Sequence, residues 1–212
     1  MSYDVRMYTG ITRGVFPVVA VETYPGHTHF TVQLTEALTR DVEIGASVAI
    51  DGVCCTVVAH ENNCLSFDAM QETRALTTLG DLRVGRSVSV ERSCRVGDEL
   101  GGHDVFGHVI GTGTISARRS VGEQLDLSVK VPAEWMRFIL HKGFIAIDGS
   151  SLTVGNVKPE GELELHLIPE TLRVTNFAKK QVGDKVNVEL DPRTVAIVET
   201  VERVLAERLA QR

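Results

Sequence analysis

Two short segments of this chain pair a thiol or hydroxyl side chain with a threonine two positions further on. Cys54 and Thr56 follow one Asp-Gly turn, and Ser151 and Thr153 follow another, 97 positions later. Alternate side chains of a β-strand point to the same face, so each pair lies on one face of its segment. Isolated serines and threonines also occur in strands for purely structural reasons. The same small polar pattern in both halves favours a polar pocket floor in each half, suited to a small ligand.

Two histidines lie between these segments in a glycine-rich stretch. His103 follows Gly101 and Gly102, and His108 follows Gly107. Imidazole can bind a metal, move protons or contact a ligand, and glycine lets backbone approach a ligand closely. Neither histidine has an acidic or thiol partner at a spacing typical of metal sites, so we predict no metal site. A single histidine more often has a structural hydrogen bond than a catalytic role.

Two further segments offer groups to a ligand. Lys142 stands at the end of a predicted helix, where its ammonium either donates to a carbonyl-rich ligand or caps that helix. Residues 166–171, His-Leu-Ile-Pro-Glu-Thr, are typical of a strand that runs into a turn. Unpaired peptide groups at a strand end can bind the imide edge of a heterocycle.

The chain contains an internal sequence repeat, and the repeated elements position those groups. Three blocks recur in the same order and with nearly constant spacing, which indicates a tandem duplication. They pair residues 50–57 with 147–154, 72–73 with 170–171, and 85–91 with 183–189. Each half alternates apolar and polar residues in short runs, with glycine or Asx turn signals about every ten residues. That texture predicts an antiparallel barrel or sandwich in each half.

Helices are predicted at two places. Residues 132–141 begin with a proline and carry Trp135, Ile139 and Leu140 for burial. Near the C-terminus, Asp191 is a predicted N-cap followed by Pro192. The apolar stripe after it is narrow, so we expect this helix to associate with copies of itself. The stripe consists of Thr194, Val198, Val201, Leu205 and Leu209.

Composition narrows the function classes. The chain has 212 residues, of which 43% are hydrophobic and 24% charged, with a formal net charge of −6. The negative charge argues against a surface that follows nucleic-acid phosphates. No run approaches the roughly 20 apolar residues of a membrane span, and residues 1–13 lack the apolar middle of a signal peptide, so we expect a cytoplasmic protein. Four cysteines without metal or disulfide spacing are expected to be free thiols.

Several long motifs in order resemble riboflavin synthases, from Met7 to about Ala206. They are residues 7–11 (Met-Tyr-Thr-Gly-Ile), 47–54, 101–103 with 107–108, 142–149 with 151–154, 166–171 and 201–203. The resemblance implies an all-β fold of two tandem six-stranded Greek-key β-barrels, with short helices and a C-terminal α-helix. It implies a first lumazine-binding barrel over 7–103, a second over 104–192, and a trimerisation helix over 193–212.

The resemblance further implies an enzyme that dismutates two molecules of 6,7-dimethyl-8-ribityllumazine into riboflavin and 5-amino-6-(D-ribitylamino)uracil. It implies a homotrimer without metal or organic cofactor, each active site lying between the first barrel of one subunit and the second barrel of another. Lumazine synthase is a further partner that it allows. The residues expected to move protons or activate the nucleophile are Cys54, His108, Ser151 and Asp191.

Substrate contacts are expected in both barrels. Those of the first are Gly10, Ile11, Thr12, Ser47, Cys54, Cys55, Thr56, Asp68, Ala69, Met70, Gln71, Glu72, Thr73, Gly107, His108 and Val109. Those of the second are Lys142, Ser151, Leu152, Thr153, Leu167, Ile168, Pro169, Glu170, Thr171 and Leu172.

The chain also departs from the family pattern. Tyr8, Phe106 and Ser150 stand where phenylalanine, serine and an apolar residue are usual, and six residues precede Met7. The leading alternative is therefore a non-catalytic relative that binds one lumazine or flavin. An oligonucleotide-binding barrel lacks the aromatic ladder it would need. A cysteine hydrolase using Cys54 and His108 lacks a nucleophile signature.

Overall fold

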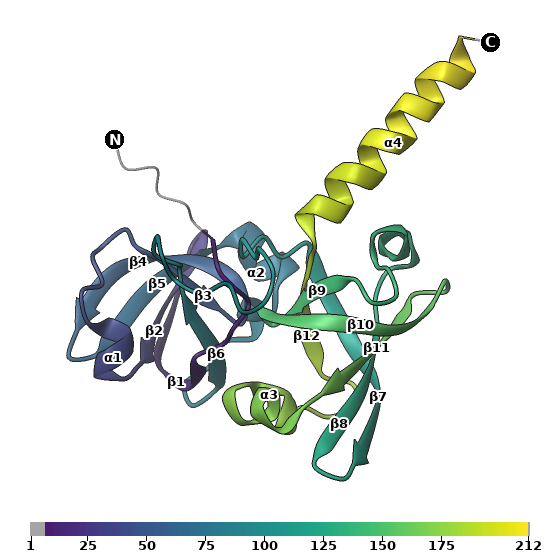
Figure 1. Ribbon diagram of the computed structural model, residues 1–212. Coiled ribbons are helices and arrows are strands. Elements are labelled where there is room, and N and C mark those ends of the chain that lie inside the picture. Colours follow the sequence, from purple (N-terminus) through teal and green to yellow (C-terminus); the bar gives the residue numbers. More distant parts are fainter. Residues whose placement is uncertain (1–6, 212) are drawn as a thin grey trace.

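The computed structural model describes residues 7–211, which form two closed six-stranded antiparallel barrels side by side (Figure 1). The first contains β1 (Gly14–Tyr24), β2 (His27–Gln33), β3 (Ser47–Ile50), β4 (Val53–Glu61), β5 (Cys64–Met70) and β6 (Ser87–Arg92). The second contains β7 (Gly111–Val121), β8 (Gln124–Lys130), β9 (Phe144–Ile147), β10 (Ser150–Lys158), β11 (Glu162–Leu167) and β12 (Lys185–Leu190).

Both barrels have the same circular strand order. The first runs β1-β2-β5-β4-β3-β6, and the second, read from β7, runs β7-β8-β11-β10-β9-β12. The chain between β2 and β3 passes over two strands of the barrel, as in a Greek key. The duplicated all-β architecture predicted from the sequence is confirmed.

Each barrel has its own apolar core because its strands alternate inward and outward side chains. In the first core the rings of Phe30 and Phe67 lie 5.3 Å apart. Leu127 and Phe177 are fully buried in the second. A third, smaller cluster joins the barrels and contains Tyr8, Ala49, Val105 and Ala146.

Short helices connect the strands. They are α1 (Glu36–Thr39), α2 (Gln71–Leu76) and α3 (Pro169–Val174), with the 3₁₀ turns η1 (Thr78–Asp81), η2 (Ala133–Phe138) and η3 (Asn176–Ala178). The helix predicted over 132–141 is therefore wrong in type and length. Pro132 precedes the turn, and Ile139 N–H bonds to the carbonyl of Met136. The chain must turn back into β9, so only a tight 3₁₀ segment fits there.

The C-terminal helix α4 (Pro192–Ala210) begins where the sequence predicts. The Asp191 carboxylate accepts hydrogen bonds from the backbone N–H groups of Arg193 (3.3 Å) and Thr194 (3.1 Å), a standard N-cap. The helix projects away from both barrels (Figure 1) and buries no side chain fully. Among the residues described, no helix is both long and apolar enough to span a bilayer.

Equivalent residues of the two halves meet where the barrels touch. Gly52 and Gly149 pack so closely that a Cβ on Gly52 would lie 2.3 Å from the backbone nitrogen of Gly149. Tyr8 and Val105, also equivalent, form an antiparallel bridge. The halves are therefore related by an approximate two-fold axis that runs through this contact.

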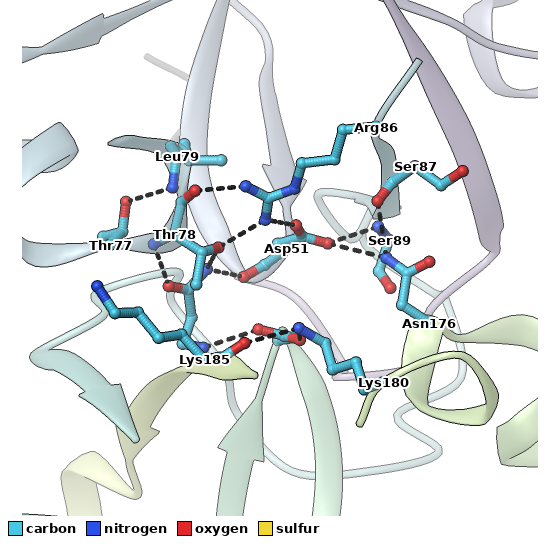
Figure 2. A network of polar contacts seen from close by, with 12 residues as sticks. Asp51, Thr77, Thr78, Leu79, Arg86, Ser87, Ser89, Asn176, Lys180 and Lys185 are labelled. Atoms are coloured by element: carbon cyan, nitrogen blue, oxygen red, sulfur yellow. Dashed lines mark hydrogen bonds and ion pairs between the residues drawn. The ribbon is translucent and has the colours of Figure 1, made fainter. Parts of the chain in front are cut away.

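A buried polar network fixes the two barrels on one another (Figure 2). The Asn187 side-chain amide of β12 donates to the backbone carbonyl of Asp51, 2.7 Å away, and to the Thr78 hydroxyl, 3.0 Å away. Arg86 pairs with the Asp51 carboxylate at 2.9 Å, and Lys180 pairs with Asp148 at the same distance. Burial, followed by repulsion from Asp148, raises the pKa of Asp51 to about 6.

Candidate functional site

The segments that precede β1 and β7 cross over, and each reaches the opposite barrel. The backbone N–H of Ser151 donates to the Gly10 carbonyl at 2.8 Å, and that of Cys54 donates to the Gly107 carbonyl at 3.1 Å. Both glycines have φ of +72°. A Cβ on Gly10 would lie 2.5 Å from Cβ of Ser151, and one on Gly107 would lie 2.6 Å from Cβ of Cys54. Only glycine fits at either position.

Two buried glutamates hold these crossing segments. Glu91 of β6 accepts hydrogen bonds from the Thr9 N–H (2.8 Å) and the Thr9 hydroxyl (2.7 Å). Glu189 of β12 accepts bonds from the N–H groups of Phe106 (2.7 Å) and Gly107 (2.9 Å). Burial raises the pKa of Glu91, and it raises the pKa of Glu189 to about 7. Glu91 and Glu189 are the last residues of the third repeated block. Their repetition is the sequence signal that could have identified them.

A cavity of about 400 Å³ lies beside the second barrel, where the segment that precedes β1 reaches it. It is lined by residues of both halves, including Gly10, Ile11, Thr12, Ser151, Ile168 and Thr171. Gly10, Ile11 and Thr12 were expected beside the first barrel, so that grouping is wrong. The chain crosses before β1 begins, and local sequence patterns do not encode such a crossing.

Ser151, which lines this cavity, has a histidine partner behind it. Nδ1 of His103 lies 2.6 Å from Oγ of Ser151, and the His103 ring stacks on Phe144 with centroids 5.1 Å apart. Burial lowers the pKa of His103, so the imidazole is neutral at neutral pH and can accept a proton. From the sequence, His103 is a candidate in its glycine-rich stretch, but proton transfer is expected at His108.

The equivalent position of the first barrel holds Cys54. Its Sγ accepts a hydrogen bond from the hydroxyl of Tyr8, 3.2 Å away. Burial is the main reason that the pKa of Tyr8 is raised, so the phenol stays protonated. His108 is exposed and its ring stacks with that of Phe106, with centroids 6.2 Å apart. The two barrels thus present a thiol and a hydroxyl at matched positions, each with a different partner.

Comparison with known proteins agrees with this duplicated site. The family model described as "Lumazine binding domain" matches residues 9–93 and again 106–191. The chain is 45% identical to the riboflavin synthase of Escherichia coli (strain K12) over 203 residues, which are 95% of each chain. The chain belongs to the riboflavin synthase family. It is therefore an enzyme of that family, with one lumazine-binding unit in each half.

Other riboflavin synthases and solved structures match at similar coverage. The enzyme of Chlamydia trachomatis serovar D is 47% identical over 169 residues, 79% of this chain and 82% of its own. The structure of LumP complexed with riboflavin has a TM-score of 0.81 at 23% identity, covering 87% of this chain and all of that one. LumP complexed with 6,7-dimethyl-8-(1'-D-ribityl) lumazine gives 0.79 at 22% identity, with 87% and 99% covered. At these identities the LumP structures establish the fold alone.

Within this riboflavin synthase fold, strand alternation divides the expected contact residues. Cys54, Thr56, Ser151 and Thr153 share the outward faces of β4 and β10, as predicted from their spacing. Several neighbours point into the cores, so only their backbone groups are available to a ligand. These are Cys55, Ala69, Leu152 and Leu167. Ser47 is also buried, but on the face of β3 opposite to the core residues Val48 and Ile50.

The expected contacts at 169–172 lie on helix α3 rather than in a turn, and Ile168 is the N-cap of that helix. Residues 169–171 form its first turn, with Pro169 at the first position. In the first barrel, Gln71, Glu72 and Thr73 occupy the same place on α2, after Met70. Asp68 of β5 bonds to Nδ1 of His29 at 2.7 Å. A larger cavity, of about 520 Å³, contacts Gln71 but neither Cys54 nor Ser151.

Lys142 and Asp191 have structural roles in the chain. Lys142 has a φ of +64°, its N–H donates to the Val154 carbonyl, and its side chain is exposed. Asp191 caps α4 and also accepts a bond from the Thr194 hydroxyl at 2.6 Å. Its charge opposes the burial effect on the pKa of His103, which places it near that histidine. Proton transfer by Asp191 stays a prediction.

Proposed function

We propose that the enzyme dismutates two molecules of 6,7-dimethyl-8-ribityllumazine into riboflavin and 5-amino-6-(D-ribitylamino)uracil without a cofactor. The observation that carries the proposal is the matched pair of sites at Cys54 and Ser151, one on each barrel. Two copies of one substrate need two similar sites, and a duplicated barrel supplies them. The side chains differ, which lets the two identical molecules play different parts.

The proposed proton acceptor is the Ser151–His103 pair. The 7-methyl protons of the lumazine are acidic because its ring delocalises the carbanion, so a weak base in the right place is enough. Burial keeps His103 neutral, and Nδ1 is 2.6 Å from the serine hydroxyl that faces the cavity. The Ser151 oxygen can take the proton of the methyl group as its own hydroxyl proton passes to Nδ1 of His103. The substrate contacts expected from the sequence that face outward orient the ring for this step.

We also propose that the enzyme is a homotrimer joined through α4, and that its active sites lie between barrels of adjacent subunits. The apolar side chains of α4 support this, because Val201, Leu205 and Leu209 are at least half exposed in the single chain. An isolated helix of this length is only marginally stable in water. Four free cysteines support a reducing compartment such as the cytoplasm.

The assay that tests the activity uses purified protein and the lumazine alone, followed by visible absorption and fluorescence. One riboflavin for every two lumazines consumed is the expected result. Tight binding without riboflavin formation would contradict the proposal and favour the non-catalytic carrier. The presence of Ser151, Thr153 and Thr171 in the second barrel favours the enzyme over that carrier. Co-sedimentation with lumazine synthase tests that enzyme as a partner.

A further inference from the structure

Tyr8 is locked in place at the contact between the two barrels. Its backbone N–H donates to the Val105 carbonyl at 2.7 Å, and the Val105 N–H donates back at 3.1 Å. Its side chain is fully buried against Ala49, Val105 and Ala146. The ring has no room to turn away, so the direction of its hydroxyl is set by the packing of both halves.

The hydroxyl of this tyrosine is aimed at the sulfur of Cys54. A buried phenol needs a hydrogen-bond partner, and among the described residues the partner is Sγ of Cys54, 3.2 Å away. Other ionisable groups near the ring are Cys55 and Glu91, which both oppose ionisation of the phenol. Tyr8 therefore acts as a donor to the sulfur and not as a base.

The backbone and Cβ of Cys54 are also held in place, so the sulfur is the group that remains for a ligand. The Gly107 carbonyl accepts its N–H, and the Gly107 backbone packs against its Cβ. Among the hydrogen bonds of the described residues, Sγ only accepts. Cys54 lies on the outer face of β4, so the hydrogen bond from Tyr8 holds its sulfur at the face that a ligand can approach.

We propose that Tyr8 is a positioning residue of the first-barrel site, fixing the Cys54 sulfur in the orientation that a bound lumazine requires. This inference rests on the proposed function. It also separates the roles of the two sites: Ser151 faces an imidazole that can take its proton, whereas Cys54 faces a phenol that only donates. Phenylalanine fills the same space without the hydroxyl, so the tyrosine adds this contact to the family's usual residue.

A double-mutant cycle tests whether Tyr8 works through the sulfur. Tyr8→Phe keeps the ring, and we expect it to lower kcat/KM for riboflavin formation about fivefold, the usual effect of one neutral hydrogen bond. In the Cys54→Ala background the same change should have no effect. Tyr24→Phe, at an exposed tyrosine, is the matched control. An equal loss in both backgrounds would show that Tyr8 acts through packing and would overturn the proposal.

Alkylation of Cys54 gives a readout that needs no turnover. Cys64→Ser and Cys94→Ser remove the other accessible thiols, and Cys55 is buried. The thiolate is the form that reacts, and a donated hydrogen bond stabilises it, so Tyr8→Phe should lower the rate constant for iodoacetamide reaction about threefold at one fixed pH. An unchanged rate constant would overturn the contact. A protein that makes no riboflavin but shows this change would count against the proposed function alone.

Discussion

Glu91 and Glu189 lie at equivalent places in the two barrels, and each holds the backbone of the segment that crosses to the other barrel. Glu91 holds Thr9, next to the glycine that contacts Ser151. Glu189 holds Phe106 and Gly107, the latter in contact with Cys54. The positions of Ser151 and Cys54 therefore both depend on a carboxylate that acts through the crossing segment.

Replacing Glu189 by glutamine should weaken the first-barrel site and the fold together. The amide oxygen of glutamine can accept a hydrogen bond, but its NH₂ group cannot accept and would face a backbone donor, whereas both oxygens of the glutamate can accept. We expect the free energy of unfolding to fall by about 2 kcal/mol in urea denaturation at pH 5, below the pKa of about 7 of Glu189, where its stabilisation is still present. Glu123→Gln, in an exposed turn, is the control and should leave stability unchanged. Equal stability of the two variants would contradict this role.

The pKa of Glu189, raised to about 7 by burial, also makes stability depend on pH. The folded protein retains this proton up to about pH 7, whereas the unfolded chain releases it near the ordinary value of 4.5. This stabilisation is therefore fully present below 4.5 and is lost as pH rises through 7. Between pH 5 and 7, the wild-type protein should lose more unfolding free energy than Glu189→Gln. Urea denaturation across that range measures the difference, and parallel profiles would disprove it.

Gly107→Ala should be much more damaging than an alanine at another left-handed glycine. Gly107 (φ +72°) has Cβ of Cys54 2.6 Å from the added methyl, whereas Gly122 (φ +60°) has no atom within 4 Å. Backbone strain alone predicts a loss of about 1 kcal/mol for Gly122→Ala. The added clash predicts about 3 kcal/mol or more for Gly107→Ala, together with loss of riboflavin formation. Thermal and urea unfolding of both variants separate the effect of backbone strain from that of the steric clash. Similar losses of stability in the two variants would rule out the tight contact with Cys54.

Ser151→Ala should lower turnover at least tenfold, or about 1.4 kcal/mol of barrier, because it removes the hydroxyl between the cavity and His103. Ser120→Ala, at an exposed strand position, should have wild-type turnover. Steady-state riboflavin formation gives kcat and KM separately. A wild-type kcat in Ser151→Ala would remove this serine from the mechanism.

Leu205→Asp should break the proposed trimer, because it places a charge in the exposed apolar stripe of α4. Thr200→Asp introduces the same charge on the opposite side of the helix and should leave the assembly intact. Sedimentation equilibrium is expected to give the mass of three chains for the wild type and Thr200→Asp, and of one chain for Leu205→Asp. An unchanged mass in Leu205→Asp would exclude α4 as the contact.

Much of the fold was open to prediction because its signals are local. Turn residues such as Asp51-Gly52 and Asp148-Gly149 need left-handed backbone, and they mark the same strand boundary in both halves. Asp191 and Pro192 predict a helix start, because the aspartate accepts hydrogen bonds from residues next to it in sequence and the proline suits the first helical position. The helix predicted over 132–141 failed because the return of the chain into β9, a tertiary constraint, overrides local preference.

The sequence by itself determined that the protein is duplicated, that side chains along its strands point alternately inward and outward, and that Cys54 and Ser151 take matched outward positions. The alternation of apolar and polar residues and the chemistry of the turn residues decide those features within a few residues. Only the tertiary structure decided which barrel each crossing segment serves, and that His103 meets Ser151 while Tyr8 meets Cys54. Those contacts join residues far apart in the chain. They depend on how the two barrels pack around their shared axis, and no local pattern specifies that packing.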